Sequence, residues 1–397
     1  MPGKQILTSI KELLQAETDR LGFLLSGTAA AAPPPTYPTF RSWVAAGLHA
    51  GMDYMAAERS LERRADPRRI EPEARSLVMV GMRYTAPSSI PDKTANEPLG
   101  RVAAYAWGDD YHDVIPARLA EIGAALEKHL GRAVQQRSYT DTGPVLERDF
   151  AQQAGLGWIG KNTCLISPHS GSYYLLGEML LDVEIEPSEP IRADHCGSCR
   201  RCIDACPTDA IREDRTIDSG RCISYLTIEN KGAIPAGLRS KMGEWVFGCD
   251  ICQMVCPWNI RFAAPEGHSA LSPREETARP VLREVLRLTP QEFNRKFRGS
   301  PLLRAKRRGY LRNAAVALGN SGDTGAVPLL AETLQTEHEP LVRAHAAWAL
   351  GQLGSAQARV TLEKTRSSES DLTVRQEIQS ALDASSPRSD PGNLSQK

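Results

Sequence analysis

Eight of the nine cysteines in the chain have the spacing of iron–sulfur ligands. The first run is Cys196-x2-Cys199-x2-Cys202-x3-Cys206, followed by Pro207; the second is Cys222, then Cys249-x2-Cys252-x3-Cys256, followed by Pro257. In bacterial ferredoxins three cysteines of such a run bind one cluster, and the fourth, before proline, binds the other. Since two 4Fe-4S clusters need eight thiolates, the sequence predicts a pair of clusters with crossed ligation.

Crossed ligation divides these cysteines into two ligand sets. The second run is interrupted, because its first ligand, Cys222, lies far upstream of the other three. We assign the first cluster to Cys196, Cys199, Cys202 and Cys256, and the second cluster to Cys206, Cys222, Cys249 and Cys252.

Structural zinc and disulfides are the alternatives for these cysteines. Zinc is usually held by paired CxxC units with a spacer, whereas runs of three cysteines and two Cys-Pro endings favour iron–sulfur ligation. Disulfides are not expected, because the chain begins without an apolar signal segment and is far larger than small stapled domains. A reducing, cytoplasmic setting is therefore expected.

The domains that position these ligands are of ordinary size. The 397 residues suffice for two or three domains. A formal net charge of zero argues against a protein that coats nucleic acid indiscriminately, but leaves room for a local basic patch. No apolar run approaches the ~18 to 20 residues that a membrane helix needs, so we expect a soluble protein.

Residues 1–186 are predicted to form a domain of mixed helices and strands. Segments 10–21 and 115–130 have helical character, and 77–82 and 173–183 are short apolar runs. The mixture indicates an α+β or α/β domain. Segment 29–38 is rich in alanine and proline, cannot continue a helix, and is predicted to be a solvent-facing connection.

The rest of the chain divides by composition. Residues 187–262 hold the cluster cysteines and should fold around their metal. In residues 309–384, Arg312, Arg343 and Arg375 occupy matching positions among alanines and leucines, which predicts two HEAT-like units and a partial cap. The tail, 385–397, is predicted to be disordered. The predicted class is α+β: an N-terminal α/β domain, a ferredoxin-like two-cluster insert and C-terminal α-helical HEAT-like repeats.

A basic connecting segment, 263–308, lies between the cysteines and the repeats. Arginine and lysine gather near its end, and no acidic residue occurs from Phe293 to Gly322. A phosphate-binding surface and a solvated face balanced by acids of another domain both give this pattern. The neighbouring repeat array favours phosphate contact.

A glycine-rich stretch of the first domain is a candidate ligand site. Asp141-Thr-Gly-Pro144 precedes a run from Gly155 to Asn162 that holds three glycines. Such density suggests a backbone that approaches a large ligand, but tight turns give the same pattern, and there is no strand-helix GxGxxG frame. Asp141 itself could be a turn residue, a helix cap or an acid catalyst.

Together these motifs resemble the epoxyqueuosine reductase family, cobalamin- and iron–sulfur-dependent enzymes of queuosine biosynthesis in tRNA. The resemblance spans nearly the whole chain. Besides the cysteine runs and the repeats, it is carried by His49-Ala-Gly-Met-Asp-Tyr54, Trp107-Gly-Asp-Asp-Tyr-His112, Asp141-Thr-Gly-Pro144, Gly155-Leu-Gly-Trp-Ile-Gly-Lys-Asn162 and Gly171-Ser-Tyr-Tyr-Leu-Leu-Gly-Glu178. The displaced Cys222 and Gly248-Cys-Asp-Ile-Cys-Gln253 are its most specific parts.

The resemblance implies a base-off cobalamin between the first domain and the cluster insert, reduced through the clusters. The implied reaction is the last step of queuosine biosynthesis, in which epoxyqueuosine loses its epoxide oxygen as water. Asp141 occupies the family's proton-donor position, and burial beside the corrin would keep its carboxyl protonated. Positional matches imply cofactor contacts at Arg64, Tyr105, Asp141, Leu165, Leu176 and Arg221.

The resemblance also implies that the substrate is tRNA carrying epoxyqueuosine at the anticodon wobble position. The modified base must leave its stack, while arginines of the basic segment and of the repeats hold phosphates. Arg304, Arg307 and Arg308 are the preferred contacts. We expect an external electron donor of flavodoxin or ferredoxin type, and a monomer, because all parts lie on one chain.

Two other functions fit part of the pattern. A corrinoid reductive dehalogenase shares the cobalamin-plus-two-cluster plan, but it needs no phosphate-binding repeat and usually carries an export signal. A ferredoxin-like carrier whose repeats dock a protein partner would bind clusters but neither corrinoid nor tRNA. The ninth cysteine, Cys164, has no cluster to serve and is predicted to be a packing residue.

Overall fold

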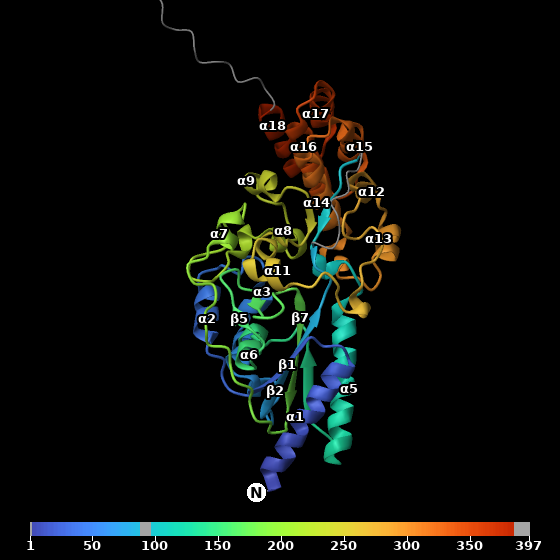
Figure 1. Ribbon diagram of the computed structural model, residues 1–397. Coiled ribbons are helices and arrows are strands. Elements are labelled where there is room, and N and C mark those ends of the chain that lie inside the picture. Colours follow the sequence, from blue (N-terminus) through green and yellow to red (C-terminus); the bar gives the residue numbers. More distant parts are fainter. Residues whose placement is uncertain (1, 88–96, 385–397) are drawn as a thin grey trace, which may run out of the picture.

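The computed structural model describes residues 2–87 and 97–384, in which a sheet, a cysteine-rich segment and a helical array follow one another (Figure 1). The strands are β1 (Leu25–Ala30), β2 (Ser76–Arg83), β3 (Arg101–Val102), β4 (Gln136–Tyr139), β5 (Trp158–Ile159), β6 (Leu165–Ile166), β7 (Tyr174–Leu181) and β8 (Trp245–Phe247). The helices before the repeats are α1 (Pro2–Arg20), α2 (Tyr37–Ala45), α3 (Asp53–Ala56), α4 (Glu58–Ala65), α5 (Tyr111–Leu130), α6 (Glu147–Gln153), α7 (Arg201–Ala205), α8 (Ile223–Ile228), α9 (Ala236–Arg239), α10 (Ile251–Met254), α11 (Pro257–Phe262), α12 (Leu282–Arg287) and α13 (Pro290–Lys296). Short 3-10 turns are η1 (Pro67–Arg69), η3 (Ala104–Ala106), η4 (Ser219–Arg221), η5 (Ser240–Met242), η6 (Ser269–Leu271), η7 (Pro301–Ala305) and η8 (Thr324–Ala326).

The first domain is built on an antiparallel sheet with the strand order β1-β2-β7-β4. The predicted apolar runs are confirmed as β2 and β7, which pair along their whole length with Val78 opposite Met179. Helices α1 and α5, also predicted, lie side by side over one face, and α6 lies on the other (Figure 1). Because both faces are covered, the two central strands are apolar almost throughout.

Segment 29–38 is only partly a connection. Ala29 and Ala30 end strand β1, in register with Leu77 and Ser76, and Ala29 is buried. Helix α2 then begins at Tyr37 with a proline in its first turn, where a missing N–H costs no hydrogen bond. The prediction of a solvent-facing connection is wrong for Ala29 and Ala31, which are buried at the edge of the sheet, whereas residues 32–36 do connect β1 to α2.

The cysteine-rich segment is joined to the first domain by backbone and side-chain bonds. Strand β3 pairs in parallel with β8, and the Ala103 N–H donates to the Phe247 carbonyl at 2.8 Å. The Ser172 N–H donates to Asn259 Oδ1 at 2.6 Å. Gly171, with φ +70°, makes this contact possible, since a Cβ there would lie 2.1 Å from the same oxygen.

The C-terminal part is the predicted stack of paired helices. These are α14 (Lys306–Asn320), α15 (Val327–Thr336), α16 (Pro340–Leu353), α17 (Ala356–Ser368) and α18 (Leu372–Ala384). A Cβ at Gly319 would lie 2.9 Å from Ala349 Cα, and one at Gly351 would lie 2.6 Å from Ala381 Cβ. Glycine at the same place in both units therefore lets α14 approach α16, and α16 approach α18. The predicted α+β class with HEAT-like repeats is confirmed.

The basic connecting segment packs on the first repeat helix. Phe293 and Phe297 of this segment contact each other and the ring of Tyr310 in α14, with centroid distances of 5.1 to 6.0 Å. The domain limits proposed above stay predictions, and the predicted tail lies outside the described residues. Within the part of the chain that the structure describes, no helix is both long and apolar enough to cross a membrane.

Candidate active site

Asp141 lies in the loop between β4 and α6. Its φ of 60° is in the left-handed region, a conformation that costs a non-glycine residue free energy. Two bonds hold the loop: Thr140 Oγ1 donates to the Leu176 carbonyl at 2.6 Å, and the Asp141 N–H donates to Glu147 Oε2 at 3.3 Å. The carboxylate remains open to a ligand, with 63% of its side-chain surface exposed.

The N-terminus of α5 supplies the partners of this carboxylate. Tyr111 OH donates to Asp141 Oδ2 at 2.9 Å, and His112 Nε2 lies 3.8 Å from the same oxygen. Asp110 caps α5: its Oδ1 accepts the His112 backbone N–H at 3.0 Å and lies 2.7 Å from His112 Nδ1. The motif from Trp107 to His112 thus lies against the Asp141 loop. Its residue types alone did not predict this contact.

These partners determine where the proton resides. Partial shielding of Asp141 from water raises its pKa, but His112 and the Tyr111 hydroxyl outweigh this effect, so the pKa is lowered. Burial lowers the pKa of His112, but Asp110 and Asp141 outweigh that effect and raise it to about 9. In this arrangement the charge of His112 favours the ionised form of Asp141. The expectation of a protonated Asp141 concerns the carboxyl beside a bound corrin, and it stays a prediction.

Two further carboxyl groups lie behind the loop. Burial, and then the charge of Asp141, raise the pKa of Glu147 to about 7. Burial also raises the pKa of Glu178 well above its ordinary value, and Glu178 Oε2 has no hydrogen-bond partner among the described residues. The site therefore holds the buried Glu178 and the half-buried Glu147 in addition to the predicted Asp141.

Two predicted cofactor contacts lie beside Asp141. Arg64, at the end of α4, is buried, lies over the Phe40 ring at 5.6 Å, and interacts electrostatically with Glu147. Tyr105, in η3, packs edge-on against Tyr111 with centroids 6.0 Å apart. Burial, and then the charge of Asp141, raise the pKa of Tyr105, which stays neutral.

The other predicted contacts differ in their surroundings. Leu165 and Leu176 are core residues, only 4% and 8% exposed, and their carbonyls accept the Tyr174 and Thr140 hydroxyls, respectively. Arg221 lies against the first cysteine run, where its Nε donates to the Thr208 carbonyl at 2.7 Å and its guanidinium pairs with Asp209.

The cluster cysteines form two neighbourhoods, and all nine cysteines are free thiols. Electrostatic interactions connect the thiols within two sets: Cys196, Cys199, Cys202 and Cys256, and Cys206, Cys222, Cys249 and Cys252. Burial and its three neighbours raise the pKa of Cys202 to about 11. Among the described residues no three metal-binding side chains converge on one ion. Cluster ligands need not do so, because each binds a different iron atom.

Cys164 lies beside the second of these sets. Its thiol is within hydrogen-bonding reach of Cys252, an interaction that lowers the pKa of Cys164 and raises that of Cys252. The neighbouring Lys161 Nζ donates to the Gly197 and Cys199 carbonyls at 2.7 and 2.9 Å. The glycine-rich stretch thus contacts the cysteine segment directly.

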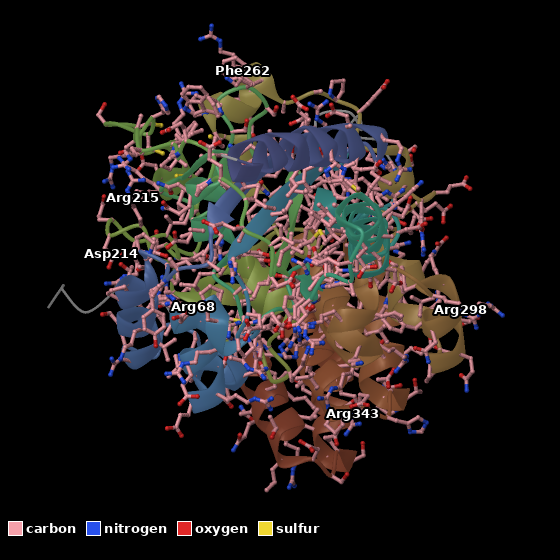
Figure 2. All side chains as sticks on the ribbon, turned by 90° about the horizontal axis from the view of Figure 1, so that it is seen from below. Arg68, Asp214, Arg215, Phe262, Arg298 and Arg343 are labelled. Atoms are coloured by element: carbon pink, nitrogen blue, oxygen red, sulfur yellow. The ribbon has the colours of Figure 1, made fainter. Side chains whose placement is uncertain are left out.

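Aromatic rings surround the first set. The Trp158 ring lies 4.9 Å from Trp258 and 4.8 Å from His195, and Trp258 stacks on Phe262 at 5.4 Å. Figure 2 shows Phe262 at the rim of the molecule. Trp158 and Trp258 also pack with Cys256, so this aromatic group links the cysteines to the surface.

The basic residues differ in their freedom to bind phosphate. Arg304 is half exposed, pairs with Glu229 at 2.7 Å, and is close enough to Asp141 for the two charges to interact. Arg308 is exposed, as is Arg298, which Figure 2 shows projecting from the molecule. Arg307 is 19% exposed and pairs with Glu337 at 2.6 Å.

The repeat arginines are engaged inside the protein. Arg312 is fully buried, and Arg343, labelled among the repeats in Figure 2, is 13% exposed and pairs with Glu369 at 2.8 Å. The prediction that the repeat arginines hold phosphates is wrong for Arg312, because its guanidinium donates hydrogen bonds to backbone carbonyls inside the protein.

Comparison with known proteins identifies relatives along the chain. Residues 64–142 match the family model "Epoxyqueuosine reductase QueG, DUF1730", residues 195–259 the "4Fe-4S double cluster binding domain", and residues 301–383 "HEAT repeats". The epoxyqueuosine reductase of Pseudomonas aeruginosa is 42% identical over 79% of this chain and 86% of its own length. That of Escherichia coli is 37% identical over 84% and 86%. A crystal structure of epoxyqueuosine reductase with an epoxyqueuosine-modified tRNA-Tyr stem loop matches 95% of this chain and 99% of its own, at 32% identity and a TM-score of 0.89.

Proposed function

Because the chain belongs to the epoxyqueuosine reductase family, we propose that this oxidoreductase reduces epoxyqueuosine to queuosine in the anticodon loop of tRNA, using base-off cobalamin and two 4Fe-4S clusters. The observation that carries the proposal is the Asp141 carboxylate. It is held in a strained loop against Tyr111 and His112, beside the cysteine segment, and is still open to a ligand.

The residues around Asp141 suit a large cofactor rich in amide groups. Buried polar atoms without partners among the described residues include Glu178 Oε2, whose carboxyl interacts electrostatically with Asp141, and, elsewhere in the first domain, His49 Nδ1 and Asn162 Nδ2. Each such atom costs about 1–3 kcal/mol unless a ligand or water supplies a partner. The amides of a corrin both donate and accept hydrogen bonds, so they could bond these unpartnered atoms. Arg64 and Tyr105 offer the cofactor a further guanidinium and a hydroxyl.

Each residue then has a distinct role in the chemistry. Bound cobalamin would supply a low-potential metal centre that takes electrons singly from the clusters and delivers them to the epoxide. Asp141 would protonate the departing oxygen, since an alkoxide leaves poorly; such proton transfer commonly contributes ~10² to 10⁴ in rate. Tyr111 orients the carboxylate through its hydroxyl, and the Thr140 bond to β7 keeps the loop in place.

The tRNA would reach this site across the basic segment. Arg304 lies between the repeats and the Asp141 loop, and Tyr54, which is 50% exposed, interacts electrostatically with both Arg304 and Asp141. An exposed aromatic ring beside arginines is suited to stack an unstacked base while the arginines bind phosphate. We place Arg304 and Arg308 on the anticodon arm, with Arg307 held back by Glu337.

Electrons would enter at the first cysteine set. Met254 and Ile260, which are 40% and 66% exposed, flank Cys256 and line a cavity of about 420 Å³. An external donor of flavodoxin or ferredoxin type docked on this apolar surface would be close to the cluster. The proposal includes a monomer in the cytoplasm, where thiols stay reduced.

Replacing Asp141 tests the proposal. In reconstituted protein with cobalamin, a reductant and an epoxyqueuosine stem loop, Asp141→Asn should lower the single-turnover rate by about 10² to 10⁴. Cobalamin, cluster and RNA binding should stay intact. Asp109→Asn is the matched control, because Asp109 is 61% exposed and pairs with Arg274 on the surface. Full activity in Asp141→Asn would remove this residue from the mechanism.

A further inference from the structure

His112 has a buried ring nitrogen without a hydrogen-bond partner among the described residues. This atom, Nε2, lies 3.8 Å from Asp141 Oδ2. The gap is too long for a hydrogen bond, but a small side-chain rotation or one water molecule would close it, and catalytic hydrogen bonds are often long before the substrate binds. The unpartnered nitrogen therefore lies where a proton could pass to Asp141.

Asp110 determines which nitrogen faces Asp141. Its Oδ1 lies 2.7 Å from His112 Nδ1, so Nδ1 carries a hydrogen and donates it. The Tyr111 ring stacks on the imidazole with centroids 4.1 Å apart and restrains its plane. The second proton of a charged His112 is therefore on Nε2, directed at Asp141. A carboxylate that orients a histidine in this way is the arrangement of catalytic triads.

We propose that Asp110 and His112 form a proton relay that reloads Asp141 during turnover. The proposal deepens the proposed function and rests on Asp141 acting as the proton donor. The reduction consumes two electrons, supplied by the external donor through the clusters, and two protons. Both carbon–oxygen bonds of the epoxide break, a carbon–carbon double bond forms, and the oxygen leaves as water. Asp141 takes each proton from His112 Nε2 and passes it to that oxygen, and His112 then regains a proton from solvent.

The charges around His112 keep its imidazole protonated at neutral pH. Asp110 and Asp141 face the ring, Arg274 acts on Asp110 from beyond η6, and Tyr111 stays neutral because burial raises its pKa. Burial alone would lower the pKa of His112, but the two carboxylates raise it to about 9. Before each proton transfer, His112 is therefore protonated and Asp141 is ionised.

The first test follows the titration of His112 without turnover. Protein labelled with ¹⁵N-histidine contains eight histidines, and His112→Asn identifies the signal of interest. His112 should titrate near pH 9 in the wild type. In Asp110→Asn and in Asp141→Asn its proton affinity should fall about ten- to a thousandfold, because an opposite charge is lost. His338→Asn, at an exposed position among the repeats, should leave it unchanged.

The second test measures single-turnover rates against pH in the reconstituted enzyme. The wild-type rate should be constant through neutrality and fall as pH rises through about 9, when His112 loses its proton. His112→Asn should lose this plateau, with a rate about 10² lower at pH 8 and a deficit that shrinks as the pH falls towards the range where Asp141 protonates directly. Asp110→Asn should move the alkaline limb to lower pH.

The outcomes separate the relay from the function on which it rests. A wild-type rate and pH profile in His112→Asn overturns the relay, even where Asp141→Asn is inactive. Full activity in Asp141→Asn refutes the donor role and the relay with it. If His112→Asn loses cluster absorbance, the titration and pH profile of Asp110→Asn decide, and an unshifted His112 signal in that variant also overturns the relay.

Discussion

Replacing Arg312 by methionine should loosen the first repeat helix from the cysteine segment. Arg312, in α14, is fully buried, and its guanidinium donates to the Leu226, Asn230 and Gly232 carbonyls at 2.6 to 2.8 Å. It also donates twice to Asn313 Oδ1, at 2.8 and 3.0 Å. Methionine is similar in length and apolar, so it removes the donors without opening a large cavity.

Two opposing effects determine the size of the change. Two buried oxygens, of Leu226 and Asn313, lose their partner at about 2 kcal/mol each, and the partly buried carbonyls of Asn230 and Gly232 lose theirs at about 1 kcal/mol each, so the loss is roughly 6 kcal/mol. Burial lowers the pKa of Arg312 from 12.5 to about 10, and removing the charge recovers roughly 3 kcal/mol of that desolvation. We therefore expect the free energy of unfolding to fall by about 3 kcal/mol.

Urea unfolding of the reconstituted protein, followed by circular dichroism and cluster absorbance, measures this change. With a slope of ~1–3 kcal/mol per molar urea, the midpoint should fall by roughly 1–3 M. Arg308→Met is the matched control on the same helix, where the side chain is exposed and the change should stay within about 0.5 kcal/mol. An unchanged midpoint in Arg312→Met would refute the claim that these bonds hold the repeats to the cysteine segment.

Two further predictions concern the RNA and the clusters. Arg304→Ala and Arg308→Ala should each weaken stem-loop binding and reduce the slope of log Kd against log salt by about 0.7. Arg307→Ala breaks the pair with Glu337 and should lower the stability of the protein more than its affinity for the stem loop. Equal salt slopes in all three variants would contradict the assignment of the phosphate contacts. Cys222→Ala should halve the iron content of anaerobically purified protein, whereas Cys164→Ala should leave all of it; iron retained in full by Cys222→Ala would exclude Cys222 as a ligand.

Local patterns predicted much of the fold. Strands β2 and β7 are apolar almost throughout because both sheet faces are covered, and the helical character of segments 10–21 and 115–130 predicted parts of α1 and α5. The repeat was visible because Arg312, Arg343 and Arg375 recur at matching positions among alanines and leucines. Such signals are contained within one element or one repeat, so they need no knowledge of tertiary contacts.

The surroundings of Asp141 were less predictable for a physical reason. His112 reaches it only because α5 packs across the sheet that carries the loop, a contact between distant segments. Burial alone predicts a neutral Asp141 carboxyl, but the opposite charge of His112 reverses the direction of the pKa shift. The recurrence of Trp107–His112 among the family motifs was the available signal.

In the basic segment, the sequence also could not show which side chains pair with residues far away in the chain. The absence of acidic residues from 293 to 322 suggests unpaired positive charge. However, Arg307 forms an ion pair with Glu337, and Arg304 forms one with Glu229, and both glutamates lie outside this range. Among the residues that the structure describes, no acid forms an ion pair with Arg312, which is instead held by backbone carbonyls. Charge composition therefore located the segment but did not identify which arginines remain exposed.

The most direct test of the central claim is nucleoside mass analysis after anaerobic incubation of the reconstituted protein with reductant and a tRNA stem loop carrying epoxyqueuosine. The account predicts that the nucleoside loses one oxygen atom, and that this conversion stops when cobalamin is omitted. An unchanged nucleoside in the presence of bound cobalamin and intact clusters would contradict it.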